Sequence, residues 1–467
     1  MSLSVVDPVA CKASNGFCWA SSGAVAWLQE ILRERFGQAI RIDTSHGDRV
    51  LLGQANSERG ITLDLNGSTF TRTDSDLPCS HWSPAAEGWR AAIASPLPAP
   101  GARQLPSPLI EETSEGFRIH YDILGLTYWM LSRREEIGRT DLDAHGRFPA
   151  SASHAYKHGY LERPIVDEWL DILGQVMQRT WPGIELTQHR FDLKLSHDVD
   201  GPSRYGFLPW AGIARAMAGN AIKRADLVGA AQAPWIRLRT TDRLHPSDPA
   251  NTFDWIMDVS ERHGLASAFY FICGRTSPQH DAHYEPEHPA IRHLMRSIHE
   301  RGHEIGLHPS YDTYRNPDAI VSEARRLRAV ADSEDIRQPH WGGRMHFLRW
   351  EHPTTIYGWE LAGMDYDSTL SYADHAGFRC GTCFEYPAFD PVAERMLNLR
   401  IRPLVAMDCS VMAPRYMGLG DGERAFEKFR QLKDACRAVG GSFTLLWHNT
   451  EFDSEAKREL YRSVVAH

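Results

Sequence analysis

From residue 191 onward the sequence alternates between short apolar segments and amphipathic segments, and this alternation limits the folds open to the chain. Segment 191–196 has apolar side chains at every second position, which predicts a β-strand. Further strand-like and helix-like segments follow in turn. The predicted strands are 191–196, 267–272, 304–307, 364–370, 403–407 and 442–447, and the predicted helices are 289–301, 317–331 and 422–438. Repeated strand-then-helix units predict a parallel sheet that can close into a barrel.

The first 190 residues have a different pattern. Apolar residues at helical spacing, and short alternating segments between turn residues, predict a mixture of helices and strands. The predicted helices are 24–36, 119–136 and 165–179, and the predicted strands are 40–42, 50–53 and 61–65. Segment 94–108 is rich in proline, which predicts an extended connector. Because 467 residues exceed one comfortable core, we predict an α/β accessory domain over 1–190 and a catalytic α/β domain over 191–467.

The composition argues against several classes of protein. A formal net charge of −9 and the lack of nucleic-acid motifs disfavour binding to nucleic acid. No apolar run is long enough to span a bilayer, and the N-terminal segment lacks the basic head and apolar core of a signal peptide. We therefore expect a cytoplasmic protein whose eight cysteines are reduced. The composition does not predict an oligomeric state.

Two carboxylates follow the strand predicted at 191–196. Asp198 and Asp200 are two residues apart, so both side chains point to the same side of the strand end. Two neighbouring anions repel each other unless a cation lies between them. A divalent metal resolves this conflict, because one carboxylate becomes a ligand and the other stays free as a base. The alternative is a strand followed by a solvated turn.

Further candidate residues follow other predicted strands. His308 and Asp312 are four residues apart, so both can face one cation, and imidazole with carboxylate suits Zn²⁺ or another first-row metal. His448 follows the last predicted strand, where a histidine can act as a general acid near neutral pH. Arg344 can keep a carboxylate ionised and orient it. Each of these residues also has an ordinary alternative, as a polar strand end or a surface ion pair.

A polar segment before the α/β region contains Asp141, Asp143, His145 and Arg147. These side chains could form a polar site, but charged residues close together are more typical of a solvated loop. We therefore predict no catalytic residue among the first 190 positions.

The motifs around Asp198, His308, Arg344 and His448 follow one another along the chain in the order that is found in the polysaccharide deacetylases of carbohydrate esterase family 4, the NodB-like domain. The chain therefore resembles this family. More closely, the chain resembles a bacterial branch in which an uncharacterised domain precedes the deacetylase domain. The segments that carry the resemblance are YWMLSRREE (128–136), DVD (198–200), GHEIGLHPSYDTY (302–314), YDSTLSYADHAGFRCGTC (366–383) and LLWHN (445–449). The similarity covers 191–453, with a looser likeness over 115–190. It implies a distorted barrel of about seven strands behind a smaller α/β domain.

The resemblance also implies catalytic roles for individual residues. Asp198 matches the catalytic base and His448 the catalytic acid, while Arg344 matches the arginine that orients the base. Asp367 matches the carboxylate that supports the catalytic histidine. The rivals for this last role are Asp365 and Asp408.

The implied metal site includes Asp200 and His308. The family usually has a second histidine four residues after the first, whereas this chain has Asp312 there. We predict that Asp312 is the third ligand, which makes the set more anionic and can favour a divalent ion other than Zn²⁺.

The implied reaction is hydrolysis of the N-acetyl amide of an amino sugar. The substrate would be a cell-surface glycan or its precursor, such as a sugar nucleotide or a lipid-linked intermediate. Two alternatives stay open because fold does not determine substrate: an amidohydrolase or deformylase acting on a non-polymeric amide, and an inactive glycan-binding homologue. Aromatic side chains in the groove would favour a sugar, although such residues more often belong to the core. The candidates are Trp341, Trp350, Tyr372 and Trp447.

Overall fold

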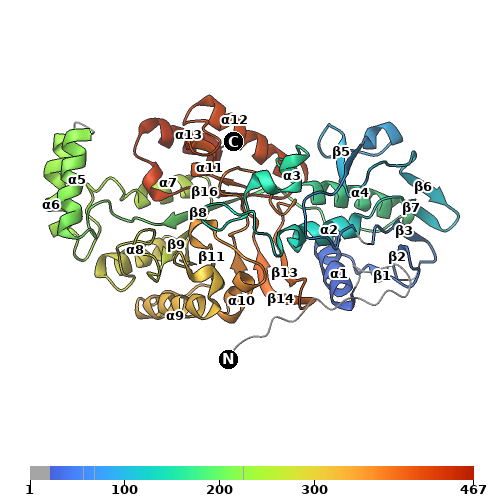
Figure 1. Cartoon of the computed structure of the whole chain (residues 1–467), viewed down its shortest axis with the longest axis horizontal. Helices are drawn as coiled ribbons and strands as arrows, with labels where there is room; N and C mark the ends of the chain where they lie inside the picture. Colours follow the sequence, from blue (N-terminus) through green and yellow to red (C-terminus); the bar gives the residue numbers. More distant parts are fainter. Residues whose placement is uncertain (1–20, 56, 68, 224–225, 467) are drawn as a thin grey trace. The chain divides into compact units, whose positions relative to one another are not determined.

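A computed structural model describes residues 21–55, 57–67, 69–223 and 226–466 (Figure 1). The N-terminal segment, for which we expect no signal peptide, lies outside the described residues. The chain forms two compact units, and each consists of separate segments. Unit 1 runs up to Arg139 and includes Ile165–Gln188 and Phe389–Met396; unit 2 comprises Thr140–Pro164, His189–Ala388 and Leu397–His467. The boundary predicted after residue 190 lies beside the junction at 188, but 140–164 belongs to unit 2 and 389–396 to unit 1.

Unit 1 is a mixed α/β unit built around a five-stranded sheet. In spatial order its strands are β1 (Arg41–Asp43), β2 (Arg49–Gly53), β3 (Gly60–Asp64), β7 (Gly116–Ile119) and β6 (Ile110–Thr113). Its helices are α1 (Ser22–Phe36), α2 (Ile123–Leu131) and α4 (Ile165–Thr180). The helices and strands predicted here are confirmed, but α2 is shorter than expected. It begins after Asp122, whose carboxylate accepts a hydrogen bond from the Gly125 amide at 2.7 Å, as a helix N-cap does.

The proline-rich segment is not a simple connector. Its residues Leu97–Pro100 form β5, which pairs antiparallel with β4 (Cys79–Trp82). Proline lacks an N–H, and prolines occur at the edges of sheets, so a two-stranded ribbon tolerates them. Leu97 and Ala99 are buried, and the Pro98 carbonyl accepts a hydrogen bond from the Trp169 indole at 2.8 Å. The prediction of a segment without secondary structure is therefore wrong for 97–100.

Unit 2 is an α/β unit whose nine-stranded sheet has the order β13-β14-β12-β11-β10-β9-β8-β16-β15. The strands are β8 (Asp192–Val199), β9 (Ser267–Ile272), β10 (Glu304–His308), β11 (Gly342–Gly343), β12 (Tyr366–Asp367), β13 (Tyr386–Asp390), β14 (Arg395–Ile401), β15 (Ala406–Met407) and β16 (Ser442–Leu446). From β14 to β15 the neighbouring strands are parallel, as predicted. Among the described residues no pairing joins β13 to β15, so closure into a barrel stays a prediction.

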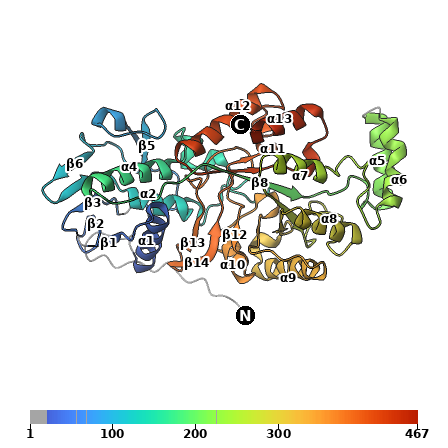
Figure 2. The ribbon, with the colours of Figure 1, turned by 180° about the vertical axis from the view of Figure 1, so that it is seen from behind.

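Most helices of unit 2 lie between these strands in the sequence, whereas α3 precedes the first of them and α13 follows the last (Figures 1 and 2). They are α3 (His154–Lys157), α5 (Trp210–Lys223), α6 (Leu227–Arg239), α7 (Phe253–Arg262), α8 (Pro289–Glu300), α9 (Pro317–Ser333), α10 (Thr354–Leu361), α11 (Asp408–Met412), α12 (Glu423–Ala438) and α13 (Glu455–Ala466). The three helices predicted in this region correspond to α8, α9 and α12. In the described part of the chain, no helix combines the length and the apolar character needed to cross a bilayer.

The parallel strands bring distant sequence segments to one edge of the sheet, because their carboxyl ends meet there. The short strand β11 depends on close backbone contact with β10. A Cβ atom on Gly343 would lie 1.9 Å from the Leu307 carbonyl oxygen, so only glycine fits this approach. The approach places the residues that follow β11 beside the end of β10.

Candidate functional site

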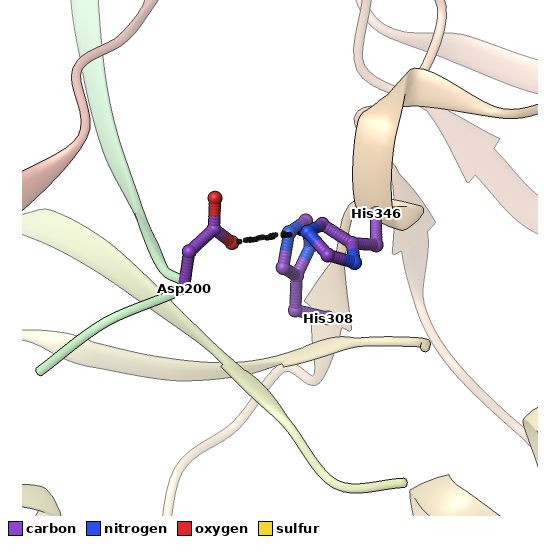
Figure 3. Close-up of side chains that lie close together, drawn as sticks. All are labelled: Asp200, His308 and His346. Carbon is purple, nitrogen blue, oxygen red and sulfur yellow. Dashed lines mark ion pairs between the residues drawn. The ribbon is translucent and has the colours of Figure 1, made fainter. Parts of the chain in front are cut away.

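Three potential metal ligands lie together at the carboxyl edge of the unit 2 sheet (Figure 3). They are Asp200, His308 and His346, and their donor atoms all lie within 4.8 Å of one another. Asp200 Oδ1 is 3.2 Å from His308 Nε2 and 3.5 Å from His346 Nε2. We call this group the Asp–His–His cluster. Sequence reasoning identified its first two members and missed the third.

The position of His346 follows from backbone pairing beyond the end of β10. The Arg344 amide donates to the Leu307 carbonyl at 3.0 Å, and the His346 amide donates to the Pro309 carbonyl at 3.2 Å. Arg344 and His346 are two residues apart in extended backbone, the same spacing that relates Asp198 to Asp200. That spacing was the sequence signal that could have identified His346.

The chain turns sharply after His346. Phe347 and Leu348 have φ angles of 60° and 55°, a left-handed conformation that L-residues other than asparagine and aspartate seldom adopt. Such strained residues cluster at functional sites. Both side chains line the cavity described below, so the strained turn belongs to the site.

Hydrogen bonds orient both imidazole rings of the cluster. His308 Nδ1 lies 2.5 Å from the Arg344 carbonyl oxygen, and His346 Nδ1 lies 3.1 Å from Asp281 Oδ1. Both partners are acceptors, so each Nδ1 carries a proton, and each Nε2, on the side of Asp200, is the atom that could bind a metal. A carboxylate or carbonyl on the far nitrogen is the usual support for a metal-binding histidine.

Asp281 is itself firmly held. Its Oδ1 accepts from the Tyr311 amide at 2.7 Å, and its Oδ2 accepts from the Ser277 amide at 2.7 Å. Burial by itself would raise the pKa of Asp281, but the hydrogen bonds from His346 and from these amides lower it below its ordinary value. Asp281 is therefore an ionised carboxylate behind His346, and no sequence motif indicated it.

The donor set fits a divalent metal ion. Asp200 Oδ1 is buried and has no hydrogen-bond partner of its own. Burial would raise the pKa of Asp200, but the adjacent His346 and His308 lower it well below its usual range. One carboxylate oxygen and two imidazole nitrogens form a ligand set typical of a first-row divalent ion with open coordination positions.

Asp312 does not join this cluster. Its side chain is 54% exposed, and its carboxylate pairs with Arg349 at 2.8 Å. The chain leaves the strand after His308, and Asp312 directly precedes a 3₁₀ turn at Thr313–Arg315. The prediction of Asp312 as third ligand is therefore corrected, because His346 and not Asp312 lies beside Asp200 and His308.

The predicted pairing of Asp198 with Arg344 is present. Asp198 Oδ1 lies 2.8 Å from Arg344 Nη1, and both side chains are almost fully buried. Arg344 also donates to Ser196 Oγ at 2.9 Å and to the Ser368 carbonyl at 3.0 Å. Asp198 Oδ2 is 3.7 Å from His308 Nε2, so the carboxylate borders the Asp–His–His cluster.

His448 also borders the Asp–His–His cluster, because its Nε2 is 3.7 Å from Asp200 Oδ2. His448 Nδ1 lies 2.8 Å from Asp408 Oδ1, and the His448 amide donates to Asp408 Oδ2 at 2.7 Å. Burial would lower the pKa of His448, but the Asp408 carboxylate raises it well above its ordinary value. His448 is thus held as an imidazolium with Nε2 facing the cluster.

Asp408, one of the two rivals, therefore supports His448, and the assignment of Asp367 to this role is corrected. Asp367 accepts a hydrogen bond from the Thr369 amide at 2.9 Å, and burial raises its pKa to about 6. Asp365 accepts from the Trp341 amide at 2.7 Å. Asp408 takes the role because it directly follows β15, which pairs with the strand that precedes His448.

A cavity of about 180 Å³ opens over these groups. Arg147 lines it and is itself buried: its guanidinium pairs with Asp143 at 2.8 Å and donates to the Phe347 carbonyl at 2.8 Å. The interpretation of this polar segment as a solvated loop is therefore wrong for Arg147, whereas Asp141 is exposed and Asp143 and His145 are partly exposed. The aromatic residues among the cavity's lining are Phe347 and Tyr416.

The four aromatic candidates from the sequence do not line this cavity. Trp350, Tyr372 and Trp447 are at most 5% exposed, so they belong to the core, as aromatic residues at such positions more often do.

Comparisons with known proteins give two kinds of similarity. Residues 27–182 match the model of a family of unknown function, DUF7033. A search of curated proteins found no match. Similar solved structures include proteins described as polysaccharide deacetylases from Mycobacterium smegmatis (18% identity, TM-score 0.36) and Pseudomonas aeruginosa PAO1 (15%, 0.35), and Puue allantoinase (13%, 0.35). Each covers 61% of this chain, which in turn covers 85% or 86% of theirs.

Proposed function

We propose that the chain is a metal-dependent hydrolase that removes the N-acetyl group from an amino sugar. The observation that carries the proposal is the arrangement around the Asp–His–His cluster. A buried carboxylate with a fixed arginine, Asp198 with Arg344, lies beside His308 of the cluster, and an imidazolium with a fixed carboxylate, His448 with Asp408, lies beside Asp200. A base and an acid next to a metal ligand set are the groups that amide hydrolysis requires.

The Asp–His–His cluster would hold one divalent metal ion, for which Zn²⁺ is the best candidate because two of the donors are imidazoles. When bound, the ion supplies a Lewis acid that polarises the acyl carbonyl and makes water more acidic. Asp200, His308 and His346 would hold the ion, and the three donors would leave room for water and substrate.

Asp198 is proposed as the general base. The guanidinium of Arg344 donates a hydrogen bond to one oxygen of this carboxylate and fixes it, so the other oxygen is available to accept a proton. That proton comes from the water that attacks the acyl carbon as the new C–O bond forms.

His448 is proposed as the general acid. Its Nε2 proton passes to the amide nitrogen as the C–N bond breaks, so the products are acetate and a free amine. Asp408 holds the ring in place and stabilises the imidazolium before the transfer.

The substrate class rests on the sequence resemblance and on the shape of the cavity. About 180 Å³ accommodates an acetamido group and part of one sugar ring, and Tyr416 at the wall is only partly buried, so its ring can contact a sugar face. We propose an N-acetylated sugar nucleotide, or a glycan intermediate carried on a lipid, as the substrate.

Purified protein tests the proposal through metal content and acetate release from N-acetylated sugar nucleotides and oligosaccharides. His346→Ala should lose both the metal and activity, whereas Asp312→Ala, the matched change at the corrected position, should retain the metal. Asp198→Asn and His448→Ala should keep the metal and lower the rate by roughly 10²-fold or more. Metal loss in Asp312→Ala together with retention in His346→Ala would reverse the ligand assignment. Full metal content without amide hydrolysis on any of these substrates would contradict the function.

A further inference from the structure

Helices α5 and α6 form a hairpin that exposes many large apolar side chains. The two helices pack against each other, as both views show (Figures 1 and 2). Of the ten large apolar residues that are exposed in the described part of the chain, six lie on this hairpin. They are Trp210 (56% exposed), Ile222 (82%), Leu227 (70%), Val228 (67%), Trp235 (51%) and Leu238 (61%). Such a concentration marks an interaction surface, whereas single exposed apolar residues are ordinary.

The inner face of the hairpin is already packed. Tyr205, Ile213, Ala233 and Ile236 form a small buried core between the helices. The segment that leads into α5 is held by Asp248, whose carboxylate accepts hydrogen bonds from Ser203 Oγ at 2.5 Å and from the Arg204 amide at 2.8 Å. The exposed residues therefore belong to the outer face of a folded element.

The most exposed apolar residues gather at one end of the hairpin. Ile222 is close to the end of α5, and Leu227 and Val228 begin α6, so the three lie on either side of the connection between the helices. We call these three residues the apolar tip. On α5 the exposed positions Trp210, Ala214, Ala218 and Ile222 recur every four residues, which places them along one face.

The hairpin region is basic although the whole protein is acidic. Segment 203–239 contains six basic residues and one acidic residue, whereas the protein has a formal net charge of −9. The basic residues are Arg204, Arg215, Lys223, Arg224, Arg237 and Arg239. The single acid, Asp226, is used as the N-cap of α6, where it accepts from the Gly229 amide at 2.7 Å. The exposed Arg239 guanidinium lies 4.4 Å from the centre of the Trp235 ring.

We propose that the α5–α6 hairpin docks on the surface of an anionic lipid bilayer. The apolar tip would enter the region between headgroups and acyl chains, and the exposed Arg215 and Arg239 would lie at the lipid phosphates. Tryptophan favours this interface, and two of the exposed residues are Trp210 and Trp235. The local excess of positive charge on the hairpin is complementary to an anionic lipid surface.

The hairpin is also connected to the candidate site. Trp210 follows Asp200 by ten positions in the sequence. A second cavity, of about 130 Å³, is lined by Asp200 and by Phe207 and Leu208, which lead into α5. Docking would therefore suit a lipid-linked amino sugar as the substrate. This consequence rests on the proposed function, whereas the docking itself does not.

Vesicle flotation of the full chain tests the docking. The probes are vesicles of phosphatidylcholine with phosphatidylglycerol, and vesicles of phosphatidylcholine alone. Wild type should float with the anionic vesicles, and added salt should weaken this binding. Leu227→Glu should weaken it, and the triple variant Ile222→Glu, Leu227→Glu, Val228→Glu should weaken it by about tenfold or more. Leu361→Glu on α10 is the matched control, because Leu361 is 65% exposed, and it should float like wild type.

Several outcomes would overturn the proposal. Wild type that stays unbound with anionic vesicles at low salt, or a triple variant that floats like wild type, would exclude docking through the apolar tip. Wild type that forms dimers without vesicle binding, and becomes monomeric in the triple variant, would instead assign the surface to self-association. Flotation does not depend on catalysis. The flotation result can therefore be interpreted even if the protein lacks the proposed hydrolase activity.

Discussion

Asp281 offers a sharp test of how the Asp–His–His cluster is built. Asp281→Asn keeps the size of the side chain but replaces one acceptor oxygen by an NH₂ donor. In wild type, Oδ1 faces the Tyr311 amide at 2.7 Å and His346 Nδ1 at 3.1 Å, while Oδ2 faces the Ser277 amide at 2.7 Å. An amide can satisfy only one of these two sides, because its NH₂ group would face a donor on the other.

The expected loss of stability follows from the backbone N–H that each orientation of the new side-chain amide leaves without an acceptor. A buried backbone N–H without an acceptor costs about 1–3 kcal/mol, so the free energy of unfolding of the metal-free protein should fall by that amount. Loss of the carboxylate behind His346 should weaken metal binding about 10–100-fold, which corresponds to about 1.4–2.7 kcal/mol. The loss of metal affinity depends on the charge of Asp281 and on the orientation that Asp281 imposes on the His346 imidazole.

Metal affinity is measured by competition with a fluorescent chelator, and unfolding by urea on the metal-free protein. Asp312→Asn is the matched control, since the same chemical change is made at a carboxylate that is 54% exposed and paired with Arg349. The control should bind metal like wild type. Equal metal affinity in Asp281→Asn and wild type would refute the reasoning, as would a larger loss in Asp312→Asn.

Three other changes address the remaining charged groups. Asp408→Asn removes the carboxylate that raises the pKa of His448. The variant should therefore lose the activity that needs the imidazolium at a lower pH than wild type does. A kcat–pH profile whose alkaline limb is the same as in wild type would argue against this pairing. Arg344→Met leaves the buried Asp198 carboxylate unpaired and should lower the free energy of urea unfolding by about 3–5 kcal/mol; a change under about 1 kcal/mol would show the pair to be dispensable for stability. Burial raises the pKa of Glu323 from 4.5 to about 7, so the folded state holds this proton more tightly, and the associated stability is lost as pH rises through 7. Relative to Glu323→Gln, the wild type should lose about 3 kcal/mol between about pH 4.5 and 8, and parallel stability curves for the two proteins would disprove it.

Much of the fold of unit 2 could be predicted because its signals are local. Apolar residues at alternate positions, or in a short run, indicate a strand, and apolar residues with a period of 3.6 indicate a helix. Each of these patterns can be recognised within about ten residues of sequence. The same local geometry placed Asp198, Asp200, His308 and His448 at the ends of strands. For unit 1, the prolines of 97–100 concealed a strand, because its pairing with β4 depends on tertiary contacts and not on propensity.

The sequence by itself therefore determined which residues stand at strand ends, and only the tertiary structure decided which of those ends are neighbours. Asp312 was chosen because it is four residues from His308, but the chain bends away there and pairs Asp312 with Arg349. His346 lies beside His308 because β11 pairs with β10, and Asp408 lies beside His448 because β15 pairs with β16. Strand order and register depend on long-range backbone pairing, whose partners are tens of residues apart, and no local periodicity records them.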